Sequence, residues 1–171
     1  MKKALLLRGI NVGGGNRLPM AELTAMLVEL GASDVQTYIA SGNAVFTGDI
    51  AASDISDAVF AAKGFRPRVM VLDETDFSLI ARANPYPEAT EVGKSLHVFY
   101  LTGPAHFDDA AAMALKADSE RYHVTERAIY LHAPDGIGRS KLVEKIDKLA
   151  GVPTTARNWN TVAKLLEMLE A

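Results

Sequence analysis

The sequence predicts an α+β chain built from two successive units, a β-α-β-β-α-β unit followed by a second that repeats this order without a clear last strand. Three observations predict this class. Short apolar runs of strand length alternate with stretches whose apolar residues recur at helical spacing. The same order of elements occurs twice within the 171 residues. Apolar residues make up 49% of the chain and charged residues 23%, which is typical of a folded globular protein rather than a disordered or fibrous one.

The first predicted unit opens with a buried strand at 3–8, followed by a glycine-rich loop at 9–19. A helix then begins near Pro19, because apolar residues recur at helical spacing as far as Leu30, and Gly31 ends it. The unit continues with a strand at 35–39, a turn at 41–43, a strand at 44–47, a helix around 55–60 and a strand at 67–72.

A further helix at 76–83 ends where Asn84-Pro85-Tyr86-Pro87 begins, since the residue before a proline disfavours helix. The segment 85–94 combines prolines, a glycine and charges, which is typical of a domain boundary. We therefore expect one domain over 1–84 and a second over 95–171.

The second unit repeats the order of the first. It has a strand at 96–101, a helix at 108–117, strands at 120–124 and 128–132, and a helix at 141–149. The polar segment 154–161 gives no clear fourth strand, and an extra amphipathic helix follows it. The order of elements predicts tandem ferredoxin-like units, with the second unit lacking a clear last strand and ending in an extra helix.

Several classes of protein are excluded by simple features. No apolar run approaches the roughly 20 residues of a spanning helix. The apolar stretch 4–7 is too short for a signal-peptide core of roughly 7–15 residues. The chain has no cysteine, hence no disulfide or thiolate metal site. We expect a soluble, cytoplasmic protein without a membrane partner.

Basic residues gather in two segments although the net charge is −3. Residues 1–20 hold four basic and no acidic side chains, and residues 136–164 hold six basic and two acidic ones. Each segment adjoins an unusual loop, so the two loops together predict an anion site of arginines and backbone N–H groups. The alternative is that both segments are solvated surface with no partner.

The loop after the first strand, Arg8-Gly9-Ile10-Asn11-Val12-Gly13-Gly14-Gly15-Asn16, stands where phosphate-binding loops stand, between a strand and a helix. Neither the Walker pattern nor G-x-G-x-x-G is present. Arg8 at the strand end is suited to a bidentate contact with a phosphate or carboxylate. A mobile loop that merely needs left-handed backbone is the alternative.

Two further segments carry candidate residues. Ser41-Gly42-Asn43 is either a plain hairpin turn or a polar tip that presents Ser41 and Asn43 to a ligand. In the segment 154–161, Trp159 either packs in the core or stacks on a base or ring, and Asn158 or Asn160 can cap the last helix. The predicted ligand-binding residues are Arg8, Asn11, Gly13, Gly14, Ser41, Asn43, Arg157, Asn158, Trp159 and Asn160.

The sequence defines no catalytic residue. The four histidines, His97, His106, His123 and His132, show no metal-ligand spacing, so we expect no metal and no cofactor. No pair of carboxylates and no nucleophile–base arrangement can be assigned from spacing alone.

Four spaced motifs resemble a known family: Arg-Gly-Ile-Asn-Val-Gly-Gly at 8–14, Met-Ala-Glu-Leu at 20–23, Thr-Tyr-Ile-x-Ser-Gly-Asn at 37–43 and Arg-Asn-Trp-Asn-Thr-Val at 157–162. Together they resemble the bacterial domain-of-unknown-function family sixteen ninety-seven over nearly the whole chain. The resemblance implies tandem ferredoxin-like units and brings no established activity, substrate or cofactor. The chain departs from the family pattern at Ala40, where a polar residue is usual, and at Ala156, which interrupts a Thr-Thr-Arg-like run.

Binding of an anionic ligand is the leading functional hypothesis. The partner would be a nucleotide, a phosphorylated metabolite or nucleic acid, although the strands at 3–8 and 44–47 lack the aromatic residues that RNA-binding sheets use for stacking. One alternative is a small enzyme in which Arg8 and Arg157 stabilise charge while Ser41 or a histidine moves protons. Another is a homodimer that serves as a protein-interaction scaffold.

Overall fold

The computed structural model describes all 171 residues, and the chain divides into two compact units. Unit 1 comprises Met1–Leu79 and Lys164–Ala171, and unit 2 comprises Ile80–Ala163. Two helices cross this division. Helix α3 (Glu74–Arg82) begins in unit 1 and ends in unit 2, and α7 (Trp159–Glu170) begins in unit 2 and ends in unit 1.

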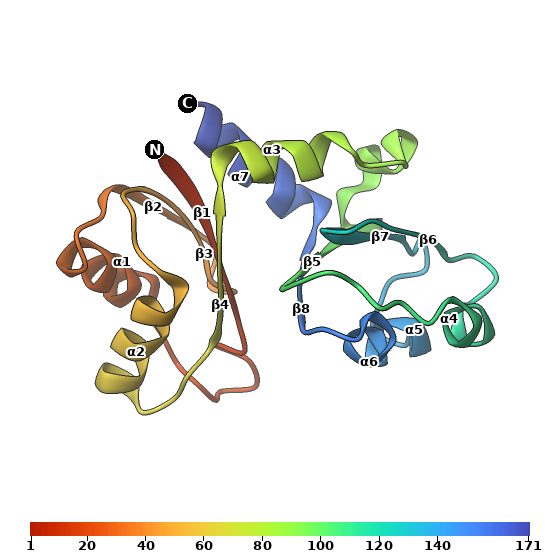
Figure 1. Cartoon of the computed structure of the whole chain (residues 1–171), viewed down its shortest axis with the longest axis horizontal. Coiled ribbons are helices and arrows are strands. Elements are labelled where there is room, and N and C mark those ends of the chain that lie inside the picture. Colours follow the sequence, from red (N-terminus) through yellow and green to blue (C-terminus); the bar gives the residue numbers. More distant parts are fainter. The chain divides into compact units, whose positions relative to one another are not determined.

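Unit 1 has a four-stranded antiparallel sheet in the order β2-β3-β1-β4. Helices α1 and α2 cover one face of it (Figure 1). In chain order the elements are β1 (Lys2–Arg8), α1 (Met20–Glu29), β2 (Ser33–Tyr38), β3 (Asn43–Thr47), α2 (Ala52–Lys63) and β4 (Arg68–Asp73). The sequence prediction placed these six elements in the correct order.

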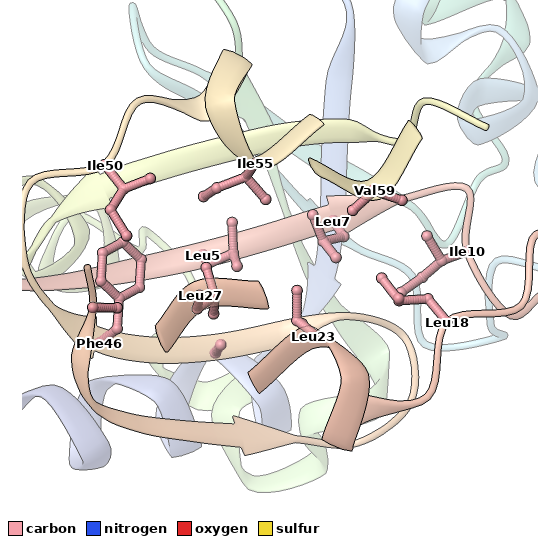
Figure 2. Close-up of a cluster of buried hydrophobic side chains, with 12 residues drawn as sticks. Leu5, Leu7, Ile10, Leu18, Leu23, Leu27, Phe46, Ile50, Ile55 and Val59 are labelled. Carbon is pink, nitrogen blue, oxygen red and sulfur yellow. The ribbon is translucent and has the colours of Figure 1, made fainter. Parts of the chain in front are cut away.

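The core of unit 1 lies between the sheet and these two helices (Figure 2). Alternate residues of β1, Leu5 and Leu7, point into it because side chains of a strand alternate between the two faces. The helices contribute residues spaced by four, which share one helix face: Leu23 and Leu27 from α1, Ile55 and Val59 from α2. All of these side chains are buried, so removing one methylene group costs about 1 kcal/mol.

Unit 2 has a second four-stranded antiparallel sheet in the order β6-β7-β5-β8. Its core joins Phe99 and Leu131 of the sheet to Leu142 and Leu149 of the helices. In chain order the elements are a 3-10 helix η1 (Pro87–Ser95), β5 (Leu96–Leu101), α4 (Asp109–Leu115), β6 (Arg121–Val124), β7 (Ala128–His132), α5 (Lys141–Glu144), α6 (Ile146–Ala150) and β8 (Thr154–Asn158). The chain is therefore an α+β protein with two antiparallel sheets, as predicted.

The expectation that the second unit lacks a clear last strand is wrong. Strand β8 pairs with β5 in antiparallel register, from Thr154 opposite Leu101 to Asn158 opposite His97. Strand recognition relies on apolar runs, and the residues of β8 are mostly polar, so the sequence analysis missed this strand. Thr155 is nevertheless fully buried. Threonine nevertheless fits a strand well, since its branched Cβ packs on a pleated surface.

Two other segments differ from the sequence prediction. The helix expected at 141–149 consists of two short helices separated at Lys145, whose φ of −105° lies outside the helical range. The segment expected as a domain boundary contains η1 (Pro87–Ser95), in which Ala89, Gly93 and Ser95 are buried.

The compact units divide between Leu79 and Ile80. The domain ranges 1–84 and 95–171 stay a prediction.

Candidate functional site

The glycine-rich loop of unit 1 is a small hairpin. The Asn11 N–H donates to the Asn16 carbonyl at 3.1 Å, and the Gly15 N–H donates to the Val12 carbonyl at 3.0 Å. Gly13 and Gly14, between them, have φ of 60° and 77°. Positive φ at both central residues is what the tightest two-residue hairpin turn requires, and glycine adopts it without steric cost.

Two asparagine side chains hold this loop in shape. The Asn11 Oδ1 accepts from the Leu18 N–H at 2.7 Å, and its Nδ2 donates to the carbonyls of Leu18 and Ala40, both at 2.8 Å. The Asn16 Nδ2 donates to the Gly9 carbonyl at 2.9 Å. Both hydrogens of the Asn11 amide are thus used within the chain, so the structure assigns Asn11 a positioning role.

The ends of the loop are anchored in the core. Ile10 is 1% exposed and Leu18 is fully buried, and both lie in the same apolar cluster as Leu7 and Val59 (Figure 2). The loop that connects these anchors therefore projects from fixed points. Val12, at the start of its turn, is 74% exposed.

The turn between β2 and β3 lies beside this loop. The bond from Asn11 to the Ala40 carbonyl links the two, and the Leu7 N–H donates to the Gly42 carbonyl at 2.8 Å. Ile39 has a φ of 50° and is 51% exposed. A β-branched residue in left-handed backbone is a genuine outlier, and such strain clusters at functional sites.

The predicted residues Ser41 and Asn43 lie in this turn but differ in accessibility. Asn43 is fully buried, and its Nδ2 donates to the Tyr38 carbonyl at 2.9 Å and to Ser41 Oγ at 3.0 Å. Asn43 therefore shapes the turn, whereas Ser41 is exposed and can meet a ligand.

Arg8 and Arg68 bring two guanidinium groups to this end of unit 1. They are register partners on the adjacent strands β1 and β4, at the end of β1 from which the loop departs. Arg8 is exposed and Arg68 half-buried, and a third guanidinium, Arg17, is exposed near the other end of the loop. Sequence analysis missed Arg68, because no local pattern shows which residue of β4 faces Arg8.

The remaining predicted site residues lie in unit 2, around the junction of β8 and α7. Arg157 is 9% exposed, and its Nη1 donates to the Ala156 carbonyl at 2.7 Å. Burial lowers the pKa of the Arg157 guanidinium to about 10, which leaves it charged at neutral pH. Asn158 Oδ1 accepts from the Thr161 N–H at 3.1 Å, so the prediction that Asn158 or Asn160 caps the last helix is confirmed for Asn158.

Trp159 and Asn160 begin α7. Trp159 is half-buried, and Asn160 packs so closely on η1 that a Cβ added to Gly93 would lie 2.0 Å from Asn160 Oδ1. The structure thus gathers Arg8, Asn11, Gly13, Gly14, Ser41 and Asn43 at one end of unit 1, and Arg157, Asn158, Trp159 and Asn160 at one junction of unit 2. That these two groups form one cleft stays a prediction.

Histidine, the side chain that most often serves as a general acid or base, is not found in unit 1. All four histidines belong to unit 2. The hydrogen bond between Ser41 and Asn43 involves an amide, which cannot take up the hydroxyl proton as a general base would.

No three histidine or acidic side chains of the chain are grouped so that they could hold a metal ion. No helix has both the length and the apolar character needed to span a bilayer.

These observations define an α+β protein with two antiparallel sheets and a glycine-rich loop that follows Arg8. The chain belongs to the family described as "Protein of unknown function (DUF1697)", whose model matches residues 1–130. Among solved structures, the chain is similar to the conserved bacterial protein SP0830 from Streptococcus pneumoniae, with 25% sequence identity, 98% of each chain covered and a TM-score of 0.70. No curated protein matches the chain.

Proposed function

We propose that the glycine-rich end of unit 1 binds a phosphate-bearing ligand. The observation that carries this proposal is the register pairing of Arg8 with Arg68 where the loop leaves β1. An anion placed between two guanidinium groups accepts charge-assisted, bidentate hydrogen bonds.

The backbone of the loop supports the same ligand. The N–H groups of Gly13 and Gly14 donate to no atom of the chain. Successive residues of this kind form a concave set of N–H groups that binds anions. Both glycines have open space around them, because no heavy atom lies within 4 Å of the position that a Cβ would take. A phosphate can therefore approach the backbone closely.

The exposed aliphatic side chains beside the loop favour a ligand larger than phosphate itself. Val12 and Ile39 are 74% and 51% exposed, and the Asn11–Ala40 bond holds their segments together. Apolar side chains beside an anion site give surface for a sugar, a base or a carbon chain. We therefore favour a nucleotide or a phosphorylated metabolite, and binding rather than catalysis, because all four histidines belong to unit 2.

We also propose that both units are ferredoxin-like. The strand order β2-β3-β1-β4 of unit 1 corresponds position by position to β6-β7-β5-β8 of unit 2. In both units a helical segment follows the first strand and another follows the third.

A thermal-shift and calorimetry series on the full chain tests the ligand proposal. The probes are inorganic phosphate, AMP, ATP, a sugar phosphate and a short single-stranded RNA, each with and without Mg²⁺. A probe present at 100 times its Kd adds about 2.7 kcal/mol of stability, which is on the order of 5–10 °C in Tm for a chain of this size. We expect such a shift with a nucleotide or sugar phosphate.

Matched variants locate the site. Arg8→Gln and Arg68→Gln each remove one guanidinium and should abolish the shift. Arg127→Gln, at an exposed position in the β6–β7 turn of unit 2, makes the same chemical change and should leave it intact. Absence of a shift with every probe, or an equal shift in all three variants, overturns the proposal. A contribution of Arg157 to the same ligand stays a prediction.

A further inference from the structure

Unit 2 contains a cavity of about 440 Å³ that includes none of the predicted site residues. It lies between the connection from α4 to β6 and the connection from β7 to α5. This volume is within the range of small-molecule sites, roughly 300–1,000 Å³. The lining residues that matter for its chemistry are Ser119, Glu120, Asp135, Arg139 and Ser140.

Glu120 is the unusual member of this lining. It is only 4% exposed, although glutamate is almost never buried without a partner. Its Oε1 accepts from the Ala117 N–H at 2.9 Å, while its own N–H donates to the Ala117 carbonyl at 3.0 Å. The second carboxylate oxygen, Oε2, accepts no hydrogen bond from the chain. Oε2 is not itself buried, because solvent reaches it, so a cationic donor that enters the cavity can bind it.

A positive charge stands on the other connection. Arg139 lines the cavity, is exposed and forms no ion pair within the chain. The third charged side chain, Asp135, already accepts from Ser119 Oγ at 2.7 Å. The cavity therefore offers Glu120 Oε2 and Asp135 Oδ1, which accept no hydrogen bond within the chain, and one unpaired guanidinium.

The connection that carries Arg139 has a defined shape. The Gly136 N–H donates to the Ala133 carbonyl at 2.9 Å and the Ser140 N–H to the Ile137 carbonyl at 3.1 Å, which gives two consecutive turns. Ser140 Oγ accepts from the Val143 N–H at 3.2 Å and joins the second turn to α5. The backbone on this side of the cavity is thus fixed by hydrogen bonds before a ligand binds.

We propose that this cavity binds a small zwitterion of the α-amino-acid class, with its ammonium group on Glu120 and its carboxylate on Arg139. A simple anion would meet the buried Glu120 carboxylate, and a simple cation would leave Arg139 unpaired. A zwitterion satisfies both groups with opposite charges, and carboxylate is the group that guanidinium recognises best.

An adjoining cavity gives room for the ligand's side chain. It has a volume of about 350 Å³ and shares Asp135 and Gly136 with the first cavity. Val92, Lys94 and Ser95 line its far side. A side chain that extends past Asp135 would meet the apolar Val92, the basic Lys94 and Asp135 itself, a surface that accommodates side chains of either charge.

Calorimetric titration of the full chain with each of the common L-amino acids tests the proposal. We expect at least one to bind. For that amino acid, the amide (no carboxylate) and the N-acetyl derivative (no ammonium) should each bind at least about tenfold more weakly. These derivatives act on the unmodified protein, so this readout does not depend on how any variant folds.

Three variants then assign the two charges. Glu120→Gln keeps an oxygen that can accept the Ala117 N–H and should weaken binding at least about tenfold, as should Arg139→Gln. Glu126→Gln, at an exposed position in the β6–β7 turn, is the control and should bind as wild type does. Failure of every amino acid to bind at millimolar concentration overturns the proposal, and so does equal binding of the N-acetyl derivative or of Glu120→Gln. Neither result depends on Arg8 or Arg68, so this proposal and the phosphate site of unit 1 stand or fall separately.

Discussion

The side-chain amide of Asn11 donates to the backbone carbonyl of Ala40 at 2.8 Å and so joins the glycine-rich loop to the β2–β3 turn. The same side chain also bonds the N–H and the carbonyl of Leu18. One residue therefore links two stretches of backbone that are 29 residues apart in sequence. The shape of the proposed anion site therefore depends on this residue as well as on the glycines of the turn.

Replacing Asn11 should loosen the loop. Asn11→Gly keeps the left-handed backbone, since φ is 53°, but removes three hydrogen bonds. We expect a loss of about 1–3 kcal/mol in the free energy of unfolding and weaker phosphate-ligand binding. Asn11→Ala should lose a further amount of about 1 kcal/mol, because alanine resists positive φ. Urea denaturation measures both, and an unchanged midpoint for Asn11→Gly would show that these bonds contribute nothing net.

Gly42 and Gly13 make a matched pair of substitutions. Both have positive φ, but a Cβ on Gly42 would lie 2.7 Å from Leu7 Cβ, whereas a Cβ on Gly13 would meet no atom within 4 Å. Gly42→Ala should therefore cost about 2–4 kcal/mol through backbone strain and overpacking. Gly13→Ala should cost only about 1 kcal/mol. The same denaturation experiment separates them, and equal losses would mean that the contact with Leu7 relaxes freely.

Relief of strain at Ile39 should stabilise the protein. Asparagine tolerates left-handed backbone far better than a β-branched residue does, and Ile39 is half exposed with φ of 50°. We expect Ile39→Asn to gain about 1 kcal/mol. Val12→Asn, which also removes an exposed aliphatic side chain, is the control and should change stability little. A gain in Tm together with weaker ligand binding would show that the strained residue serves the site.

The fold could be predicted from sequence where local patterns determine it. The apolar run of β1 and the four-residue spacings of α1 and α2 predict a buried strand and two amphipathic helices, and the structure uses residues of all three in the core of unit 1. Strand β8 could not be predicted in this way. Its residues are polar, and Thr155 and Arg157 are buried by pairing and packing that no local pattern encodes.

The candidate site, like the fold, could be predicted from the sequence only in part. The glycine-rich loop and the polar turn could be located from composition alone. The roles of Asn11 and Asn43 could not, because each depends on a partner that only the fold supplies. Arg68 faces Arg8 through strand register, and Glu120 lines a cavity formed by two separate connections, so neither has a signal in the local sequence.

The buried imidazole of His97 should make stability depend on pH in the weakly acidic range. His97 is 7% exposed, its Nδ1 has no hydrogen-bond partner, and burial lowers its pKa from the usual value of 6.5. Below pH 6.5 the unfolded chain therefore takes up a proton at this residue that the folded chain does not, and stability falls as pH falls. A single group of this kind contributes a slope of at most about 1.4 kcal/mol per pH unit.

Urea denaturation between pH 7.5 and pH 5.5 should show a shallower decline for His97→Leu than for wild type. His106→Gln, at an exposed position, should follow the wild-type curve. If the wild type and His97→Leu decline in parallel, the folded protein protonates His97 as readily as the unfolded chain does, and the strand β5 that carries it must open in that pH range.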